Sequence, residues 1–393
     1  MQPLPTVRVN RKAADRIHSG HVWIFTSDIL DANSAAAGDT ARVIDHRGRP
    51  LGVAHYSSTS QISLRLLSHH VESIDQSFLL KRIQAAYALR QRLVSGSDAY
   101  RLVHAEGDLL PGLVVDRYAD WLVVQLLNQG MDRLSNDIIA ALEAVLQPAG
   151  IIARNDVAVR AKENLPLEVR VLAGEVPDQI SIHMNGLTCR ADLHGGQKTG
   201  VFLDQRENYL AARRYGAHYG KSRALDCFTG TGGFALHLAS VCDSVEAVES
   251  SAAALDVARA NAETNHFTNI AFHQADVLDY LPSLVAARRT FDIVIVDPPA
   301  FTKSRGALEG ATRGYKEINL RALRLLQPGG TLVTCSCSHH MSEAHLLEII
   351  AAAALDCGKQ LRVLERRTQS QDHPILLTIP ETHYLKCLIF EVL

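Results

Sequence analysis

Hydrophobic runs of strand length alternate with helix-like stretches in the second half of the chain. The helix-like stretches place apolar residues three or four positions apart, the spacing of one helix face. Because apolar strands separated by helices are typical of parallel βαβ units, residues 183–393 are predicted to form an α/β domain with a doubly wound, Rossmann-like sheet. The five predicted strands are RALDCF (223–228), SVEAVES (244–250), IAFHQAD (270–276), FDIVIVDPP (291–299) and GGTLVTCSCS (329–338). Two further runs, LRVLERR (361–367) and HYLKCLIFEVL (383–393), are predicted to pair antiparallel at the sheet edge.

The first half of the chain has a different pattern, with short β-rich runs bounded by turns. Residues 1–73 contain HVWIF, ARVID, LGVAHY and ISLRLL, and a hairpin-like turn, DHRGRP, separates two of these runs. This pattern predicts a small β-barrel or sandwich. Residues 74–182 combine helical spacing over 78–94 and 130–146 with the strand-like runs RLVHAE, LPGLVVDRY, WLVVQLLN and IIARND. They are predicted to form a central α+β domain.

The composition, 47% hydrophobic and 21% charged, is that of an ordinary soluble globular protein. No apolar stretch reaches the ~18 residues that a membrane helix needs, and no secretory signal is visible, so we expect a cytoplasmic protein without a membrane segment. The seven cysteines lack metal-ligand spacing, so no metal site is expected. A net charge of −2 means that any contact with RNA must rest on local basic patches. Two candidate patches are Arg8, Arg11, Lys12 and Arg16, and Lys303, Arg305, Arg313 and Lys316.

The first strand of the α/β region runs into a glycine-rich turn, LDCFTGTGGF (225–234). Glycines lack a Cβ, so this backbone can turn tightly and approach a ligand. An acid about 20 residues further on, Glu249, suits ribose hydroxyls, and Asp276 suits an adenine amine. Each acid could instead be a strand-end residue or a helix N-cap. The predicted nucleotide-cofactor site comprises Asp226, Phe228, Thr229, Gly230, Gly232, Gly233, Glu249, Ser250, Asp276 and Val277.

The identity of the cofactor depends on Asp226, which lies inside the turn. A carboxylate there would repel the pyrophosphate of a dinucleotide such as NAD. S-adenosylmethionine has no phosphate and carries a positive sulfonium and an amino group, so it tolerates an acid at this place. The pattern D-x-F-x-G-x-G-G therefore predicts S-adenosylmethionine as the cofactor.

The fourth strand of the predicted sheet ends in Asp297, Pro298, Pro299, Ala300 and Phe301. Two consecutive prolines fix φ and remove two amide donors, so the chain must leave the sheet as a rigid extended loop. Ligands of doubly wound sheets bind at this edge. We expect Asp297 to accept a hydrogen bond from a base held there, close to the cofactor, with Pro298, Pro299 and Phe301 beside the base.

The fifth strand ends in Cys335 and Cys337, at the same edge as Asp297. C5 of cytosine is a poor nucleophile, and a thiolate that adds to C6 makes C5 reactive toward a methyl sulfonium. Because the strand is expected to end between the two cysteines, Cys337 is the predicted nucleophile and Cys335 a buried apolar residue. Asp297, acting with a water, is a hypothesis for the base that later removes the C5 proton.

Together, these motifs resemble those of the bacterial large-subunit ribosomal RNA cytosine-C5 methyltransferases, over nearly the whole chain. The family has an N-terminal PUA domain, a central α+β domain and a C-terminal class I methyltransferase domain. WIFTSDI and SSTSQISLRLL resemble its PUA segment, and RLVHAEGDLLPGLVVDRY resembles its central-domain signature. KTGVFLDQREN (198–208) resembles the stretch before the glycine-rich turn, and DCFTGTGGF, DPPAF and SCS resemble the cofactor loop, the fourth strand and the nucleophile.

The resemblance implies 5-methylcytosine as product, formed in large-subunit ribosomal RNA by Cys337, and a homodimer is plausible from it. It also implies that a set of residues before the turn lines the cofactor and base pocket: Lys198, Phe202, Asp204, Gln205 and Arg206. Two positions depart from the family, which usually has a lysine where this chain has Ala300 and often a tyrosine where it has Phe202. The β-rich N-terminus would dock RNA by shape, and the target base would be flipped out of its stack.

Three other functions compete with this prediction. A methyltransferase acting on a guanine or adenine nitrogen needs no cysteine and typically has an aromatic residue after Pro-Pro, where this chain has Ala300. An NAD-dependent oxidoreductase is disfavoured by Asp226 and by the Asp-Pro-Pro loop. A catalytically silent RNA-binding protein is disfavoured by the intact set of acids, glycines and cysteine.

Overall fold

The protein divides into two compact units whose segments interleave along the chain. The computed structural model describes residues 4–196, 199–220, 222–301 and 308–393. The first unit holds the residues up to Ile182, together with Ala191–Val201 and Gln371–Thr382. The second holds His183–Arg190, Phe202–Ser370 and His383–Leu393, so the chain passes between the units five times. In the part of the chain that the structure describes, no helix has the length and hydrophobicity to span a membrane.

The first unit begins with a six-stranded sheet, in the order β2-β6-β5-β4-β1-β3. β4 and β5 pair antiparallel around the predicted turn, where Asp45 accepts hydrogen bonds from the amides of Arg47 and Arg49. All four strand-like runs expected in this region are therefore confirmed. The strands are β1 (Thr6–Val9), β2 (Trp23–Phe25), β3 (Ile29–Asp31), β4 (Thr40–Ile44), β5 (Pro50–Tyr56) and β6 (Ile62–Ser68).

A helix, α1 (Arg11–His18), corrects the expectation of strands and turns alone in this region. The side chain of Asn10 accepts a hydrogen bond from the amide of Ala13 and so caps the helix start. Ala13, Ala14 and Ile17 lie on one face and pack into the core of the sheet. Helical spacing was therefore present in the sequence, but over only two turns.

The rest of the first unit is built on a five-stranded sheet, in the order β11-β10-β9-β8-β7. Its strands are β7 (Ala99–His104), β8 (Leu113–Tyr118), β9 (Trp121–Leu126), β10 (Gly150–Arg154) and β11 (Val169–Gly174). Its helices are α2 (Gln76–Leu93), α3 (Gln129–Arg133), α4 (Ser135–Leu146) and α5 (Ala158–Lys162). The single helix expected over 130–146 is thus two helices, divided at Leu134. Ser135, Asn136 and Asp137 follow that break, and such residues favour helix starts over helix interiors.

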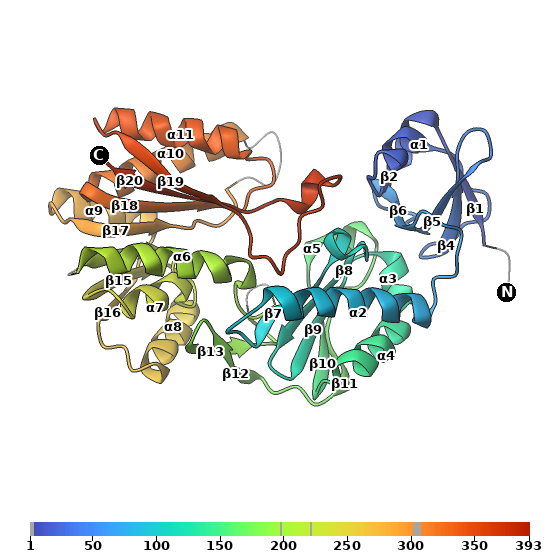
Figure 1. Cartoon of the computed structure of the whole chain (residues 1–393), viewed down its shortest axis with the longest axis horizontal. Coiled ribbons are helices and arrows are strands. Elements are labelled where there is room, and N and C mark those ends of the chain that lie inside the picture. Colours follow the sequence, from blue (N-terminus) through green and yellow to red (C-terminus); the bar gives the residue numbers. More distant parts are fainter. Residues whose placement is uncertain (1–3, 197–198, 221, 302–307) are drawn as a thin grey trace. The chain divides into compact units, whose positions relative to one another are not determined.

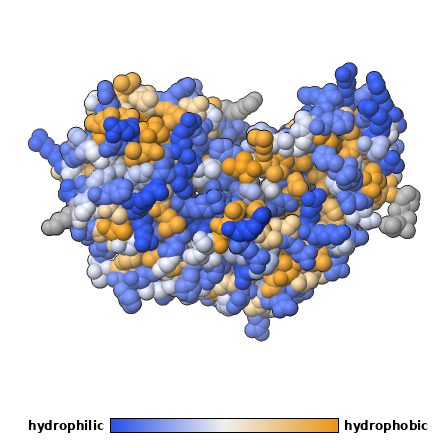
Figure 2. Space-filling view, viewed as in Figure 1, coloured by the Kyte–Doolittle hydropathy of each residue, from blue (hydrophilic) through white to orange (hydrophobic). Residues whose placement is uncertain are grey.

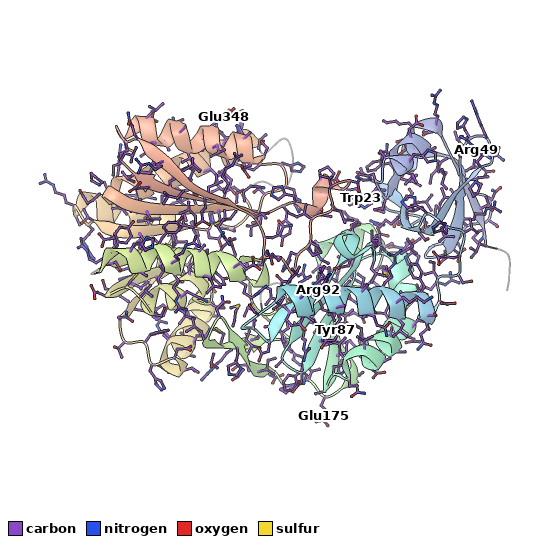
Figure 3. The ribbon with its side chains drawn as sticks, in the orientation of Figure 1. Trp23, Arg49, Tyr87, Arg92, Glu175 and Glu348 are labelled. Carbon is purple, nitrogen blue, oxygen red and sulfur yellow. The ribbon has the colours of Figure 1, made fainter. Side chains whose placement is uncertain are left out.

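Hydrogen bonds join distant segments within the first unit. Trp23 of β2 donates from its indole nitrogen to Glu106 at 2.8 Å; Trp23 is labelled in Figure 3. Arg90 of α2 donates to the carbonyl oxygen of Asp372 at 2.7 Å, and the Asp372 side chain accepts from the amide of Arg101 on β7 at 2.9 Å. Residues 371–382 are therefore part of this unit, although they lie far along the chain.

The second unit is built on a seven-stranded sheet, in the order β16-β15-β14-β17-β18-β20-β19. β14 to β18 are parallel to one another, and β20 runs antiparallel to both of its neighbours. This confirms the doubly wound sheet and the antiparallel pair at its edge. The strands are β14 (Arg223–Cys227), β15 (Ser244–Glu249), β16 (Ile270–Gln274), β17 (Phe291–Val296), β18 (Leu326–Ser336), β19 (Leu361–Arg367) and β20 (Lys386–Val392).

Helices cover both faces of this sheet, as Figure 1 shows, with α10 and α11 on one face and α6, α7 and α8 on the other. On the first of these faces, Leu323 and Ile350 are buried against the sheet residues Val294 and Leu332. Figure 2 shows hydrophobic surface residues interspersed with hydrophilic ones on the side drawn. The helices are α6 (Arg206–Gly216), α7 (Gly233–Ala239), α8 (Ala252–Thr264), α9 (Val277–Ala286), α10 (Leu308–Arg324) and α11 (Glu343–Asp356).

A two-stranded sheet of β12 (Gln179–Met184) and β13 (Leu187–Asp192) contains the segment His183–Arg190 of the second unit. Asn261 of α8 and Asn265, the residue that follows this helix, hold β13 by its main chain. Asn265 accepts from the amide of Thr188 at 2.9 Å and donates to its carbonyl oxygen at 2.6 Å. Asn261 accepts from the amide of Arg190 at 2.8 Å. Side-chain amides thus take the place of a neighbouring strand.

Candidate active site

The carboxyl ends of four parallel strands meet at one level of the seven-stranded sheet. Cys227 of β14 pairs with Val296 of β17, and Val296 pairs with Thr334 of β18. On the other side, Cys227 pairs with Val248 of β15. The next residue of each strand, at positions 228, 249, 297 and 335, therefore lies at the same edge. The strand order reverses between β14 and β17, and doubly wound sheets bind ligands at such a switch point.

The glycine-rich turn leaves β14 through a left-handed backbone. Phe228, Gly230 and Gly232 have φ angles of 64°, 55° and 93°. The amide of Thr229 donates to the carbonyl oxygen of Val248 at 3.0 Å, which ties the turn to β15. At the position that a Cβ on Gly230 would take, the described residues offer a single atom within 4 Å, a ring carbon of Phe202 at 3.6 Å. A side chain at Gly230 would therefore meet little of the described protein, although the residue itself is buried.

The carboxylate of Asp226 is fully buried beneath this turn. Its Oδ2 accepts hydrogen bonds from the Thr229 hydroxyl at 2.6 Å and from the Ala235 amide at 2.9 Å. Its Oδ1 is also buried and has no hydrogen-bond partner among the described residues. Burial, with the nearby charges of Asp297 and Glu249, raises the pKa of Asp226 to about 7. A cationic donor that reached Oδ1 would favour the ionised form.

Glu249 ends β15 and holds the glycine-rich turn. Its Oε2 accepts from the amide of Gly230 at 3.1 Å, and its Oε1 accepts from the amide of Ser251 at 2.9 Å and the hydroxyl of Ser250 at 3.2 Å. Each carboxylate oxygen has two lone pairs, so these bonds leave acceptor capacity for ribose hydroxyls. Glu249 therefore has a structural role at the turn that the sequence pattern did not indicate.

Asp276 follows β16 and caps α9, which is the alternative that the sequence left open. Its Oδ1 accepts from the amide of Leu278 at 2.8 Å, while the carboxylate as a whole is exposed. Val277, the first residue of α9, is buried in the core. A helix cap of this kind uses one oxygen of the carboxylate, so the cap and an adenine contact are compatible.

Asp297 follows β17 and is bridged to α6 through a buried glutamine. Gln205 donates from Nε2 to Asp297 Oδ2 at 3.0 Å, and its Oε1 accepts from Asn208 at 2.7 Å. Asn208 in turn donates to the carbonyl oxygen of Thr368 at 3.1 Å. Because both ends of the Gln205 amide are bonded, its orientation is fixed, and Asp297 is held at the level of the glycine-rich turn.

The other residues expected before the turn lie around the short 3₁₀ segment η3 (Leu203–Gln205). The carbonyl oxygen of Phe202 accepts from the Tyr209 hydroxyl at 3.4 Å, and its ring faces Gly230. Asp204 is buried and accepts from the Tyr384 hydroxyl at 2.8 Å. Arg206, the first residue of α6, is buried and pairs with Glu207. Lys198 lies outside the described residues.

The loop after Asp297 packs against α10. Pro298 is buried and Pro299 is exposed. The ring of Phe301 lies 4.8 Å from that of Tyr315, and the two planes are tilted by 58°. Tyr315 is itself fully buried, so it anchors Phe301 beside the end of β18.

The two cysteines of the fifth strand have different surroundings. Cys335 is fully buried, lies opposite Cys387 of β20, and has a pKa raised well above that of a free thiol by burial. β18 ends at Ser336, so Cys337 is the first residue beyond the strand, and it is half-buried. The flanking Ser336 and Ser338 are buried and contact the Tyr315 hydroxyl at 2.8 and 3.2 Å. Tyr315 therefore fixes the main chain on both sides of Cys337.

Three residues near this edge were missed by the sequence analysis. Tyr209 is buried, and its hydroxyl would lie 2.5 Å from a Cβ on Gly233. Asn261 donates to the carbonyl oxygen of Thr231 at 3.2 Å and so supports the glycine-rich turn from α8. Lys386 of β20 is opposite Ser336 and is buried. Their spacing in the sequence gives no signal, because each depends on a contact between distant elements.

The predicted basic patches are partly neutralised within their own units. Arg11 pairs with Asp15, and Arg16 with Asp28. In the second patch, Arg313 pairs with Glu309 of the same helix. A further part of that patch, Lys303 and Arg305, lies outside the described residues.

Family models match both ends of the chain. A model of a PUA-like domain matches residues 7–69, and a model of a methyltransferase domain matches residues 219–376. These matches cover the six-stranded sheet and most of the seven-stranded sheet. They confirm the PUA-like and methyltransferase parts of the predicted fold.

Solved structures and curated relatives extend the similarity to the whole chain. A putative SAM-dependent methyltransferase from Streptococcus mutans superposes with a TM-score of 0.84, at 22% identity over 99% of this chain and 100% of that one, which shows a shared fold. Ribosomal RNA large subunit methyltransferase I from Tolumonas auensis is 40% identical over 98% of both chains. The protein of the same name from Shewanella denitrificans is 41% identical over 95% of both. At this identity and coverage, the chain belongs to the ribosomal RNA large subunit methyltransferase I family.

Proposed function

We propose that this protein methylates a cytosine at C5 in large-subunit ribosomal RNA, with S-adenosylmethionine as methyl donor and Cys337 as nucleophile. The position of Cys337 carries the proposal. It is the first residue beyond β18, half-buried, at the edge that also holds Asp297 and the glycine-rich turn. Cys335 is fully buried and has a raised pKa, so it is poorly suited to attack a base. Family membership supports ribosomal RNA as substrate and disfavours an oxidoreductase.

The residues at the turn fit S-adenosylmethionine. Asp226 Oδ1, buried and without a partner among the described residues, would accept from the positively charged amino group of the methionyl part. Glu249 would bind the ribose hydroxyls, with Ser250 beside it, and Asp276 and the Val277 amide would bind the adenine. When bound, this cofactor supplies an electrophilic methyl group.

The proposed chemistry at the base begins with Cys337. Its thiolate adds to C6 of the cytosine, so a C6–S bond forms and C5 becomes nucleophilic. C5 then takes the methyl group, and a base removes the C5 proton while the C6–S bond breaks and the C5–C6 double bond re-forms. Asp297, which accepts a hydrogen bond from Gln205, would bind the base edge and, through a water, accept that proton.

The residues around Asp297 would bind the flipped base. Pro298, Pro299 and Phe301 would lie beside the base, and the ring of Phe301 is in contact with that of Tyr315. Phe202 and Arg206 lie on the η3 and α6 side, and Lys198 completes the set expected from the resemblance. A base flipped out of its stack needs apolar or aromatic surfaces of this kind.

The remaining proposals concern the whole chain. Residues 1–73 would be the RNA-docking PUA domain, 74–182 the central domain and 183–393 the catalytic domain. The substrate would make the protein cytoplasmic, and the resemblance favours a homodimer. Sedimentation at micromolar concentration would distinguish the dimer from a monomer by mass.

The proposed function is tested by nucleoside mass spectrometry of large-subunit ribosomal RNA. RNA from cells that lack the gene should lose one 5-methylcytosine, and the gene should restore it. A Cys337→Ala gene should fail to restore it, whereas Cys357→Ser, which changes the other half-buried cysteine, should succeed.

The nitrogen methyltransferase makes the opposite prediction. If Cys337→Ala restores the missing nucleoside, or if that nucleoside is a methylguanine or methyladenine, the cytosine-C5 proposal is wrong. Binding of S-adenosylmethionine by purified Cys337→Ala, measured by calorimetry, confirms that the variant is folded and that its defect concerns the base.

A further inference from the structure

A lysine is buried at the start of β20, the strand that pairs with β18 close to Cys337. Lys386 is the first residue of β20, lies opposite Ser336 of β18, and is 3% exposed. Its ammonium donates to the carbonyl oxygens of Ser338 at 2.7 Å and Tyr384 at 2.8 Å. Lysine is almost never fully buried without a charged partner, because its desolvation is costly. The arrangement therefore needs an explanation beyond packing.

Two negative groups act on Lys386. Burial lowers the pKa of Lys386 from 10.5 to about 8, and the charges of Cys337 and Glu343 oppose that shift. The Glu343 carboxylate is already bonded to Arg366 of β19. The half-buried thiol of Cys337 is thus the partner whose charge Lys386 is placed to balance. With a pKa near 8, Lys386 is still mainly protonated at pH 7.

Three described groups near Cys337, on α10, after β17 and on α11, are neutral or negative. Tyr315 of α10 is neutral at physiological pH, as tyrosine ordinarily is, and burial raises the pKa of its hydroxyl further. Asp297, after β17, is negative when ionised, and its carboxylate accepts from Gln205. Glu343 stands at the start of α11. Among these described groups, Lys386 is the one that favours a thiolate.

We propose that Lys386 is a positioning residue that stabilises the thiolate of Cys337 and fixes the main chain beyond it through Ser338. When the thiol ionises, its proton leaves to solvent, and the ammonium of Lys386 balances the remaining charge. The inference rests on the proposed function in that Cys337 is the nucleophile. It adds Lys386 of β20 to the residues proposed for the reaction, which otherwise come from the glycine-rich turn, the Asp-Pro-Pro loop, the Ser-Cys-Ser motif and the segment before the turn.

The inference is tested by the pH dependence of Cys337 alkylation with iodoacetamide, followed by peptide mass spectrometry. The full-length protein is used without RNA or cofactor, in a Cys357→Ser background, where Cys337 is the cysteine that is not buried. Only the thiolate reacts, so the midpoint of the rate profile reports its ionisation. The wild-type midpoint should lie at least one pH unit below ~8.5, the value for a free thiol.

Variants of Lys386 should move this midpoint. Lys386→Met should raise it by about one unit or more, which is a tenfold loss of alkylation rate at pH 7. Lys386→Gln, which keeps a donor for Ser338, should raise it similarly, and Lys386→Arg should restore most of the reactivity. The matched control is Lys359→Met, because Lys359 also donates to main-chain oxygens, those of Leu323 and Leu326, and is close to Cys357 instead. It should leave Cys337 unchanged.

A wild-type midpoint at or above ~8.5 would overturn the inference whether or not the variants fold. So would a folded Lys386→Met or Lys386→Gln protein with the wild-type midpoint. Neither result affects the proposed function, since alkylation requires no methyl transfer. Conversely, formation of 5-methylcytosine by Cys337→Ala would overturn the proposed function. That result would not change the pH profile of Cys337 alkylation, which tests the role of Lys386 separately.

Discussion

At the scale of single residues, the protonation of Asp226 links stability to cofactor binding. Its carboxylate is fully buried, and its pKa is raised to about 7, far above the ~3.9 of an unfolded chain. The folded, cofactor-free protein therefore binds this proton more tightly than the unfolded chain does. It follows that the stabilising contribution is present below pH ~4 and is lost as pH rises through about 7.

We expect Asp226→Asn to flatten this dependence. Between pH 5 and pH 8, the free energy of unfolding of the second unit should fall by about 2–3 kcal/mol more in wild type than in Asp226→Asn. Urea unfolding at each pH, monitored by hydrogen exchange of the β14 and β17 amides, measures this difference in the free energy of unfolding. The variant should also bind S-adenosylmethionine at least tenfold more weakly, because an amide cannot balance the amino group. Parallel pH profiles in the two proteins would contradict the prediction.

Gly233 gives a second prediction at this scale, because a Cβ there would lie 2.5 Å from Tyr209. Gly233→Ala should destabilise the second unit by ~1–3 kcal/mol through overpacking and should weaken cofactor binding. Gly310→Ala is the matched control, since Gly310 lies in α10 with no described atom within 4 Å of its Cβ position. It should be neutral or stabilising by up to ~1 kcal/mol. Thermal unfolding followed by circular dichroism compares the two; equal effects would mean that Tyr209 moves freely.

Single residues also show what the sequence could predict about the site. Asp297 and Cys337 each follow an apolar strand, and Asp226 lies next to the end of another. Parallel strands bring their ends together, so the proximity of these residues was predictable from the pattern. Gln205 and Asn261 act through contacts between elements far apart in sequence, and no local pattern reports those contacts. The Asp276 side chain illustrates the limit, since the same position serves as a helix cap and as a predicted adenine ligand.

At the scale of elements, α8 connects β13 to the glycine-rich turn. Asn261 and Asn265 both bond the main chain of β13, and Asn261 also donates to Thr231 in the turn. One face of this helix therefore supports both the strand and the cofactor loop.

The two asparagines should differ in their effect on the cofactor. Asn261→Ala and Asn265→Ala should each lower the free energy of unfolding by ~1–3 kcal/mol, because each leaves main-chain groups of β13 without a partner. Only Asn261→Ala should also weaken S-adenosylmethionine binding, through loss of the bond to Thr231. Calorimetric titration of both variants at a temperature where they are folded makes the comparison. Equal losses of affinity would show that β13, and not the turn, transmits the effect.

Elements were predicted best where their hydrophobic period was long. The strands of the seven-stranded sheet and α2 are continuous patterns, whereas α1 has two turns and was missed. The division between α3 and α4 depends on the backbone at Leu134, within a sequence whose apolar period continues. The position of β20 between β18 and β19 is a property of the topology. The sequence alone therefore could not predict that Lys386 of β20 lies close to Cys337.

At the scale of the whole molecule, one late segment belongs to the first unit. Residues 371–382 follow most of the second unit in sequence, yet Asp372 is bonded to Arg90 and Arg101, and Ile379 is buried in the core of the six-stranded sheet. A substitution in this segment should therefore change the stability of the first unit.

We expect Asp372→Ala to destabilise the first unit by ~1–3 kcal/mol, since it removes a buried acceptor from the amide of Arg101. Both tryptophans, Trp23 and Trp121, lie in that unit, so tryptophan fluorescence during urea unfolding reports on it selectively. Glu391→Ala, at a half-buried position in β20, should leave the fluorescence midpoint unchanged. An unchanged midpoint in Asp372→Ala would contradict the assignment of the segment.

The five passages of the chain between its units also bear on how the protein is synthesised. Translation proceeds from the N-terminus, and domains commonly fold as soon as they emerge. Here the first unit lacks its segment Gln371–Thr382 until residue 382 has been made, and β20, which separates β18 from β19, is formed later still, by Lys386–Val392. Neither half can reach its finished form on a truncated nascent chain. Premature termination between residues 202 and 371 should therefore leave both units incomplete and open to proteases.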